Sequence, residues 1–285
     1  MIFSRLVALL YLPLVSALHV LRSSDQAASR NQTTHHMLVV DHVPKCAGTF
    51  VNFMAKHSVN DTNLRLVHER FQLTTDDVGP GKFVVGMVRN PFDYYISLWA
   101  YQGYIEELSE EDFAAIRPLG HPPGNHSEDA TRFQLFLERF SDRELGLLSF
   151  LMFFSYLDFD GLVPSSKWPW RGTVKKFLGN ETTRLTRRQR VWAALDEFSG
   201  AKSPVNCWVK TEDASASTQT CFQEFAAQGG EVNFTAFQAA LDSQYTNSNK
   251  HFSCSQVYTN ESLSFVKTGD AEIFRIFGYP QRCVA

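Results

Sequence analysis

Two apolar runs in the first third of the chain predict buried strands. Residues 37–43 and 83–88 are rich in β-branched and other apolar side chains, which is typical of parallel strands covered on both faces. A segment with helical features follows each run. Pro91 suits the first turn of the second helix, and residues 48–57 have helical spacing, with one face formed by Phe50, Phe53, Met54 and His57. The pattern predicts strand–loop–helix units and an α/β fold with a central parallel sheet.

The rest of the chain adds one short strand and several helices. Residues 64–69 predict a strand that ends in two titratable side chains, His68 and Glu69. Helical patterns recur near residues 106–116, 131–140, 145–156 and 186–198, and a loop rich in Gly and Pro lies at 120–125. No internal repeat is visible, so we expect one domain.

The loop after the first strand has the features of an anion-binding site. Residues 44–49 are small, and their backbone N–H groups can approach an anion at a helix N-terminus, with Lys45 as a point charge and Thr49 as a hydroxyl donor. A Walker loop is disfavoured, because the spacing G-x-x-x-x-G-K-[ST] is absent and the lysine precedes the glycine. The loop therefore predicts a phosphate cradle of another kind.

Cys46 lies inside this loop and raises the question of a nucleophile. A phosphatase-type cysteine loop requires an arginine six positions later, and this chain has Asn52 there, which offers no bidentate grip on a phosphate. We therefore interpret Cys46 as a small loop residue and keep a catalytic thiol as the lesser alternative.

The second strand is followed by a second candidate for anion binding. Arg89 directly follows the run 83–88, at the end of the strand where ligands of open α/β sheets collect. Arg89 and Ser97 offer a guanidinium fork and a hydroxyl to a second phosphate group. The alternative is an arginine that pairs with a helix carboxylate.

The ordered pair of motifs resembles the PAPS-dependent sulfotransferase family, in the branch with P-K-x-[AG]-G-T and V-R-N-P-[WF]-D-[WY]-Y-[VI]-S. The chain carries P-K-C-A-G-T at 44–49 and V-R-N-P-F-D-Y-Y-I-S at 88–97. Residues 208–213 resemble the family's strand with a following acidic segment, and 247–279 resemble its C-terminal part. The resemblance covers residues from about 37 to 281, loosely across the middle.

This resemblance implies a three-layer α/β/α domain with the P-loop-NTPase-like sulfotransferase fold. It also implies a reaction, the transfer of a sulfuryl group from PAPS (3′-phosphoadenosine 5′-phosphosulfate) to an acceptor hydroxyl, with a carbohydrate as the favoured acceptor and no metal ion. The 5′-phosphosulfate would be held by the loop residues Lys45, Cys46, Ala47, Gly48 and Thr49, and the 3′-phosphate by Arg89 and Ser97. Lys250 is a further candidate nucleotide contact, with an ordinary surface lysine as an equal alternative.

Two positions depart from the family pattern. The family often has an aspartate after the arginine and a second arginine one turn into the helix, where this chain has Asn90 and Tyr94. These differences bear on donor affinity and not on the type of reaction.

A hydroxyl acceptor needs a base near the transferred group, and His68 is the first candidate. An imidazole with a pKa near neutrality can accept the acceptor proton while Lys45 stabilises the charge on the departing phosphate. The resembling branch has a histidine at this place. Glu69 is the alternative base, and a surface histidine at the end of a strand is the structural alternative.

Composition agrees with a single compact domain. The 285 residues are 44% hydrophobic and include 24 phenylalanines, which is enough to bury a large core. The formal net charge of −3 weighs against nucleic-acid binding. The sequence does not indicate an oligomeric state.

The N-terminal segment predicts export. Arg5 precedes the apolar run 6–15, and small residues permit cleavage after Ala17. We expect residues 1–20 to be a signal peptide or an uncleaved membrane anchor, 21–36 a polar stem, and 37–285 the sulfotransferase domain. The expected location is the secretory pathway, in the Golgi lumen as an anchored or soluble protein, or outside the cell after secretion.

Sequons and cysteines agree with this route. Six N-x-[ST] sequons suggest a glycoprotein, at Asn31, Asn60, Asn125, Asn180, Asn233 and Asn260. With Cys46 assigned to the loop, two disulfides can form from the other four cysteines, Cys207, Cys221, Cys254 and Cys283, in a connectivity that spacing does not reveal. No cysteine pair has zinc spacing, so we expect no metal site.

The middle of the chain, residues 101–205, is expected to determine acceptor specificity. Within it, residues 167–190 contain eight basic side chains and a single acid, beside Trp168 and Trp170. This segment could bind an anionic sugar chain, with indoles stacking on sugar rings, although a solvated basic helix is slightly favoured. Two rival functions remain: a nucleotide-dependent P-loop kinase, and a catalytically inactive carbohydrate-binding relative.

Overall fold

One parallel sheet organises the part of the chain that the structure describes. The computed structural model describes residues 37–67, 73, 74, 76–101, 108–120, 127–156, 174, 178–199, 203–243 and 254–283. Its sheet contains four strands in the order β2-β1-β3-β4, and every neighbouring pair is parallel. The strands are β1 (Met37–Asp41), β2 (Leu64–Val67), β3 (Lys82–Val88) and β4 (Cys207–Lys210). The prediction of an α/β fold with a central parallel sheet is confirmed.

The strand order reverses between β1 and β3. From β1 the chain first pairs with β2 on one side and later with β3 on the other. Connections that leave neighbouring strands in opposite directions open a crevice at their carboxyl ends, where ligands of such sheets bind. Because Val40 pairs with Val85, and Val88 pairs with Lys210, the carboxyl ends of these strands lie along one edge.

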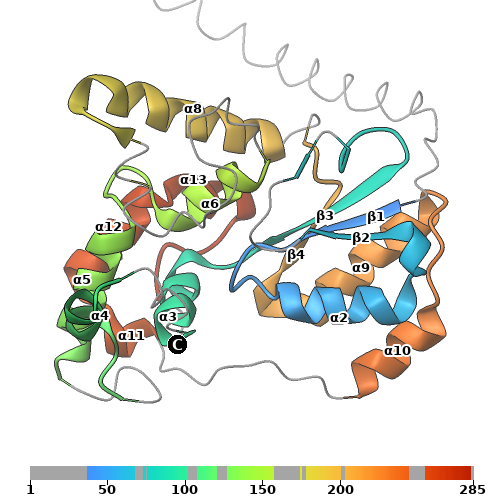
Figure 1. The fold of residues 1–285 in the computed structure, drawn as a ribbon, viewed down its shortest axis with the longest axis horizontal. Helices are drawn as coiled ribbons and strands as arrows, with labels where there is room; N and C mark the ends of the chain where they lie inside the picture. Colours follow the sequence, from blue (N-terminus) through green and yellow to red (C-terminus); the bar gives the residue numbers. More distant parts are fainter. Residues whose placement is uncertain are drawn as a thin grey trace, which may run out of the picture. The chain divides into compact units, whose positions relative to one another are not determined.

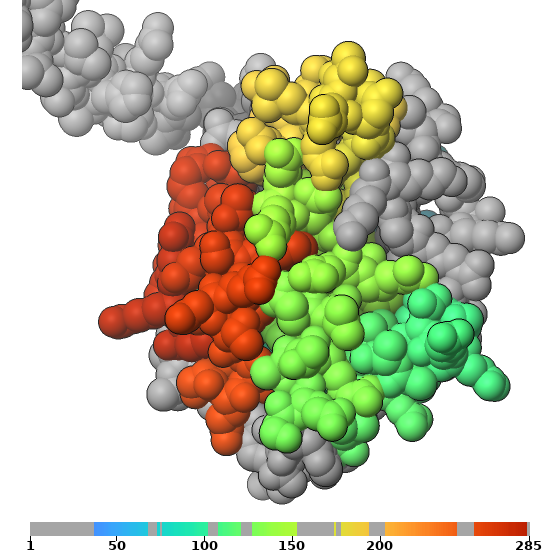
Figure 2. Space-filling model, turned by 90° about the vertical axis from the view of Figure 1, so that its left-hand side faces the viewer, coloured from blue at the N-terminus to red at the C-terminus, as the bar shows by residue number. Residues whose placement is uncertain are grey.

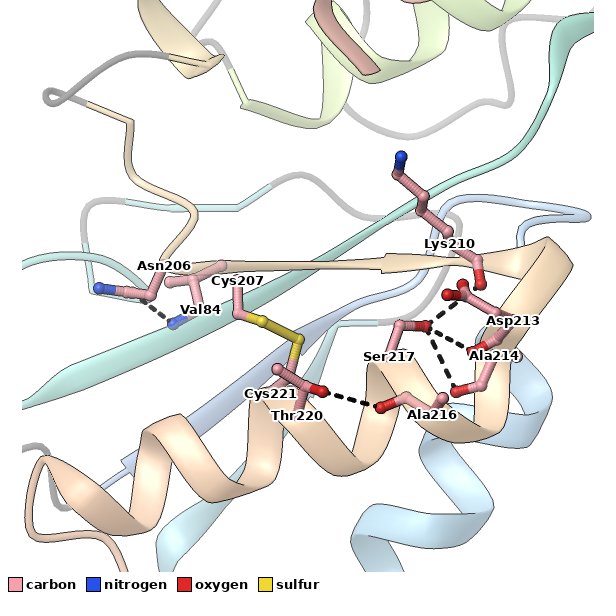
Figure 3. Close-up of a disulfide and its surroundings, with 10 residues drawn as sticks. All are labelled: Val84, Asn206, Cys207, Lys210, Asp213, Ala214, Ala216, Ser217, Thr220 and Cys221. Atoms are coloured by element: carbon pink, nitrogen blue, oxygen red, sulfur yellow. Dashed lines mark hydrogen bonds between the residues drawn. A yellow bond between two sulfur atoms is a disulfide. The ribbon is translucent and has the colours of Figure 1, made fainter. Parts of the chain in front are cut away.

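Three helices lie together on one side of the sheet (Figure 1). They are α2 (Gly48–Ser58), α9 (Ala214–Ala227) and α10 (Phe234–Asp242). A disulfide between Cys207 and Cys221 fastens β4 to α9 (Figure 3). Just before β4, Asn206 exchanges two hydrogen bonds with the backbone of Val84, at 2.7 and 2.8 Å. These contacts fix a strand that is far from β3 in sequence.

The helix α2 packs against its neighbours through small side chains. The innermost line of this helix consists of small or medium side chains, Gly48, Val51, Met54, Ala55 and Ser58. Phe50 and Phe53 are half-buried against the core, and His57 is exposed, with its Nδ1 2.8 Å from the Phe53 carbonyl oxygen. Phe53 and His57 do share a helical face, with their ring centroids 4.2 Å apart. The innermost line is made of smaller residues because α2 contacts the sheet, α9 and α10, and close approach on several sides favours small residues.

The helix α3 (Pro91–Tyr101) is deeply buried, with nine of its residues buried. It is contacted by α5, α11 and α12. Figure 2 shows this helical region, with α8 in yellow, the middle of the chain in green and the C-terminal helices in orange and red. Its other members are α4 (Glu110–Ile116), α5 (Asp129–Phe140), α6 (Leu147–Tyr156), α8 (Glu181–Ser199), α11 (Cys254–Val257), α12 (Asn260–Gly269) and α13 (Ala271–Phe277).

Several sequence predictions are confirmed in this region, with shifted boundaries. The helices predicted near residues 106–116, 131–140, 145–156 and 186–198 correspond to α4, α5, α6 and α8. A second disulfide joins Cys254 to Cys283, and Cys46 is free and buried. Four cysteines thus form two bridges, as expected. Sheet and helices together are compatible with a three-layer arrangement.

The N-terminal segment falls outside the described residues. The proposed signal peptide or anchor and the polar stem both lie within residues 1–36 and stay predictions. Within the described ranges, no helix has both the length and the apolar character that a membrane span requires.

A buried carboxyl group joins α3 to the C-terminal helices. Asp270, which has no exposed surface, accepts hydrogen bonds from the hydroxyl of Tyr95 at 2.7 Å and from the amide and hydroxyl of Ser149 at 2.8 and 2.7 Å. Gly146 permits this approach, since a Cβ there would lie 2.1 Å from the Asp270 carboxylate. Burial raises the pKa of Asp270 to about 6, although these donors oppose the shift.

We expect Asp270→Asn to change the pH dependence of stability. Because the folded pKa lies above the ordinary value of 3.8, the folded protein keeps a proton that the unfolded chain releases between about pH 4 and 6. The resulting stabilisation is complete below pH 4 and is lost as the pH rises through 6. Relative to the variant, the wild type should lose roughly 3 kcal/mol of unfolding free energy between pH 4 and pH 7, measured by urea titration.

The matched control is Glu231→Gln, which changes an exposed acid. Its unfolding free energy should follow the wild-type pH curve. If the curves of the wild type and Asp270→Asn are parallel from pH 4 to 7, then Asp270 does not take up a proton on folding.

Candidate anion-binding site

The loop between β1 and α2 has the backbone geometry of an anion-binding nest. Lys45 and Ala47 both adopt left-handed conformations, with φ of 62° and 64°. These conformations are costly for residues other than glycine and point to a local constraint. A nest forms where successive N–H groups belong to residues that alternate between right- and left-handed conformations, and left-handed residues at the alternate positions 45 and 47 fit this pattern. Neither residue is a glycine, so composition alone gave no sign of this geometry.

The first turn of α2 provides further backbone donors beside this nest. Its N-cap residue, Ala47, has no side chain that could cap the first amides, and the first amides of any helix lack partners within the helix. The amide of Cys46 donates to the carbonyl of Val43 at 3.2 Å and closes the turn. The backbone donors that suit an anion are therefore those of Ala47, Gly48 and Thr49, and Thr49 is exposed.

A close contact explains why glycine is required at position 48. The ring of His42 lies against Gly48, and a Cβ at position 48 would come within 1.7 Å of His42 Cδ2. The ring itself, and not the tip of a flexible side chain, occupies this space. His42 thus supports the floor of the loop directly after β1.

Arg89 joins the second predicted element to this loop. It follows the last residue of β3, and its Nη1 donates a hydrogen bond of 3.1 Å to the carbonyl oxygen of Lys45. The two motifs are far apart in sequence, and the reversal of strand order brings them together. The structure therefore places the guanidinium of Arg89 against the backbone of Lys45.

Cys46 lies beneath the loop. Its side chain is fully buried, and burial raises the pKa of the thiol, an effect that Glu212 and Asp41 reinforce and that Arg89 and Lys45 oppose. A buried, protonated thiol is a poor nucleophile. These properties fit the interpretation of Cys46 as a small loop residue.

One face of α3 is turned toward the loop. The Nζ of Lys45 lies 4.2 Å from the centre of the Tyr101 ring, a cation–π contact. Ser97 precedes Tyr101 by one helical turn and lies on the same face. Only 5% of Ser97 is exposed, whereas Tyr101 is 55% exposed. Ser97 thus lies below the surface, one helical turn before the residue that contacts Lys45.

The structure accounts for the two departures from the family pattern. Asn90 caps α3, since its side-chain oxygen accepts a hydrogen bond of 3.0 Å from the amide of Phe92. Asparagine and aspartate serve equally well as N-caps. Tyr94 is fully buried and packs edge-on against Tyr95, so this position supports the core.

The segment after β4 reaches the same edge of the sheet. The hydroxyl of Thr211 donates to the carbonyl of Val88 at 3.1 Å, and Glu212 accepts from the amide of Asn90 at 2.6 Å and from the hydroxyl of Tyr279 at 3.0 Å. The sequence of residues 208–213 indicates only a strand with a following acidic segment. A parallel fourth strand places such a segment beside Arg89, but the sequence does not give the strand order.

Three predicted site residues lie outside the described residues. They are His68, Glu69 and Lys250, and their roles stay predictions. Val67, the residue before His68, pairs with Asp41 at the carboxyl end of β1. The strand that leads to His68 therefore ends at the same edge of the sheet as β1.

The basic segment 167–190 is described only in part, and Trp168 and Trp170 are among the residues not described. In the described part, Arg184 pairs with Asp142 and Glu144, and Arg188 pairs with Glu144 at 3.7 Å. The guanidinium of Arg188 also lies 4.4 Å from the centre of the Trp192 ring. Ion pairs with neighbouring acids agree with the interpretation as an ordinary basic helix.

Comparisons with known proteins give no independent assignment. No family model, no curated protein and no solved structure matches the chain. The function must therefore be inferred from the motifs and from the geometry of the loop, Arg89 and the segment after β4.

We predict that Gly48→Ala distorts the loop. The added methyl group must displace the His42 ring, and overpacking of this kind costs about 1–3 kcal/mol. The urea midpoint should fall accordingly. The double variant His42→Ala, Gly48→Ala tests the cause, since removal of the ring should make it more stable than the sum of the single effects allows. Additive effects would mean that the two residues do not constrain one another.

Proposed function

We propose that the protein is a PAPS-dependent sulfotransferase with the P-loop-NTPase-like sulfotransferase fold. The observation that carries this proposal is the hydrogen bond from Arg89 to the backbone of Lys45, which joins a left-handed anion nest to a guanidinium at the point where the strand order reverses. Two separate anion-binding elements at one sheet edge suit a nucleotide with phosphate groups at both its 5′ and 3′ positions.

Each element has a distinct part in the proposed binding. Lys45 and the amides of Ala47, Gly48 and Thr49 would hold the 5′-phosphosulfate, and Arg89 and Ser97 the 3′-phosphate. Lys45 lies over the ring of Tyr101 and can exchange this contact for a stronger one with an anionic oxygen. The nest supplies fixed dipoles that need little reorganisation during the reaction.

The proposed reaction transfers the sulfuryl group of PAPS to an acceptor hydroxyl. The bond between sulfur and the bridging phosphate oxygen breaks while a bond forms between sulfur and the acceptor oxygen. The acceptor proton passes to a base, and the other product is 3′-phosphoadenosine 5′-phosphate. The ammonium of Lys45 stabilises the charge that develops on the departing phosphate. The proposed acceptor is a carbohydrate hydroxyl.

The proposed location is the lumen of the secretory pathway. The disulfides Cys207–Cys221 and Cys254–Cys283 support it, because such bonds persist in oxidising compartments. Glycosylation at two of the predicted sites is sterically compatible with their local structure. Asn180 and Asn233 accept backbone hydrogen bonds through Oδ1, which leaves the side-chain nitrogen, the atom that carries a glycan, outside the cap.

We predict that Lys45→Ala removes turnover and leaves the fold intact, because the lysine charge is needed mainly in the transition state. Turnover is measured with labelled PAPS and a panel of glycans, glycolipids and tyrosine peptides. The matched control is Lys56→Ala, which removes an exposed lysine from the last turn of α2 and should react like wild type. Turnover near wild type in folded Lys45→Ala would reject the donor-loop assignment.

The same preparation distinguishes the rival functions. Calorimetry with 3′-phosphoadenosine 5′-phosphate and with ATP, with and without Mg²⁺, compares the two nucleotide classes. Preference for ATP with phosphoryl transfer would favour a kinase. Glycan binding with no transfer of either group would favour an inactive carbohydrate-binding protein.

A further prediction concerns the base. We expect His68→Ala to lower kcat by roughly a hundredfold to ten-thousandfold and to leave product-nucleotide binding nearly unchanged, because His68 is proposed to act on the acceptor proton. Glu69→Gln is the companion variant and should stay within a few-fold of wild type. A large defect in Glu69→Gln, with an active His68→Ala enzyme, would assign the base to the carboxylate instead.

A further inference from the structure

We propose that Thr211 and Glu212 are positioning residues of the anion site, which hold Arg89 in place from the end of β4. This inference rests on the proposed function and adds two residues to it. Neither residue contacts the loop of Lys45 through a hydrogen bond that the structure records; both act on the backbone around Arg89.

The two side chains hold the two peptide groups that flank Arg89. The Thr211 hydroxyl binds the carbonyl of Val88, which belongs to the peptide group before Arg89, at 3.1 Å. Glu212 Oε1 binds the amide of Asn90, which belongs to the peptide group after it, at 2.6 Å. Together these bonds restrict both backbone dihedral angles of Arg89, and so the direction in which its side chain leaves the strand.

With its direction fixed in this way, the side chain of Arg89 ends beside the loop. Its Nη1 reaches the carbonyl of Lys45 at 3.1 Å, and Lys45 is one of the two left-handed residues of the nest. A guanidinium gains bidentate geometry on a phosphate only when its plane is fixed. Displacements of about 1 Å at such sites can cost a hundredfold in rate.

The segment that carries Thr211 and Glu212 is in turn bound to the C-terminal segment. Glu212 Oε2 accepts a hydrogen bond of 3.0 Å from Tyr279, and Lys210 Nζ donates one of 2.9 Å to the carbonyl of Phe277. Burial, followed by the charge of Glu212, raises the pKa of Tyr279, so the phenol keeps its proton and donates. Lys210, which directly precedes Thr211, is thus fixed both to this segment and to Val88 of β3.

A positioning role explains why an acid lies beside a site for anions. Its negative charge opposes anion binding through space, so a purely electrostatic effect of removing it would strengthen binding. Both carboxylate oxygens accept hydrogen bonds from neighbouring groups, which suits a structural acceptor better than a base that must receive a proton from a substrate. Replacing Glu212 by alanine is therefore expected to weaken anion binding, whereas loss of the negative charge alone would strengthen it.

The test compares two nucleotides by calorimetry, 3′-phosphoadenosine 5′-phosphate and 5′-AMP, which lacks the 3′-phosphate. Glu212→Ala should weaken binding of the first roughly tenfold and leave the second nearly unchanged, as should Arg89→Ala. Thr211→Val, which keeps the shape and loses the hydroxyl, should show the same selectivity with a loss of about threefold to tenfold. Glu212→Gln keeps the acceptor oxygen for Asn90 and should stay within about threefold of wild type in both binding and turnover.

The control is Asp213→Ala, which removes the neighbouring exposed acid, whose side chain caps no helix. It should not weaken binding of either nucleotide. Equal weakening of both nucleotides in Glu212→Ala would show a general structural defect and overturn the inference. A hundredfold loss of turnover in Glu212→Gln with wild-type nucleotide binding would also overturn it and would mark Glu212 as a base.

The same measurements distinguish failure of the proposed function from failure of the inference on Thr211 and Glu212. If the wild type binds neither nucleotide, the sulfotransferase proposal fails, and the inference fails with it. If the wild type prefers the nucleotide with the 3′-phosphate and all Thr211 and Glu212 variants keep this preference unchanged, only the inference is wrong.

Discussion

Backbone groups at the ends of parallel strands need partners, and this need shapes the edge of the sheet where β1, β3 and β4 end. Beyond the last ladder bond, the carbonyl of Val88 and the amide of Asn90 are bound by side chains of the segment after β4. The carbonyl of Lys45 is bound by Arg89. Polar main-chain groups near a protein interior are costly when they lack partners, so the same bonds that satisfy them also align the functional side chains.

The helical region supports this edge through α3. The helix carries Ser97 and Tyr101 toward the loop, and its opposite contacts include the buried carboxyl of Asp270, which binds Tyr95. The Tyr258 hydroxyl also donates to the carbonyl of Phe92 at 3.0 Å. Buried polar contacts of this kind restrict a helix to one position more strongly than apolar packing does. The orientation of α3 relative to the sheet is therefore set from both sides.

The sequence predicted what depends on local pattern. The strands β1 and β3 were predictable because buried parallel strands are continuous apolar runs, and Lys45 and Arg89 were found because each follows such a strand. The left-handed backbone at Lys45 and Ala47 was not predictable, since neither residue is a glycine. Glu212 was missed because its partner Asn90 is distant in sequence, and local patterns carry no information on strand order. Helical spacing placed Phe53 and His57 on one face, but it does not indicate which line of α2 lies innermost, because packing against the sheet, α9 and α10 decides that.

The contact between Glu212 and Tyr279 has a consequence for biosynthesis. The nest and Arg89 belong to the first third of the chain, and β4, with its acidic segment, is translated much later. Tyr279 follows only after the last helix, α13. Because loops that close such distances are slow to form, a nascent chain can contain both anion-binding motifs while the residues that align them are still absent. The residues proposed to contact the ligand are thus synthesised first, and the edge of the sheet becomes complete only after Tyr279 has been synthesised.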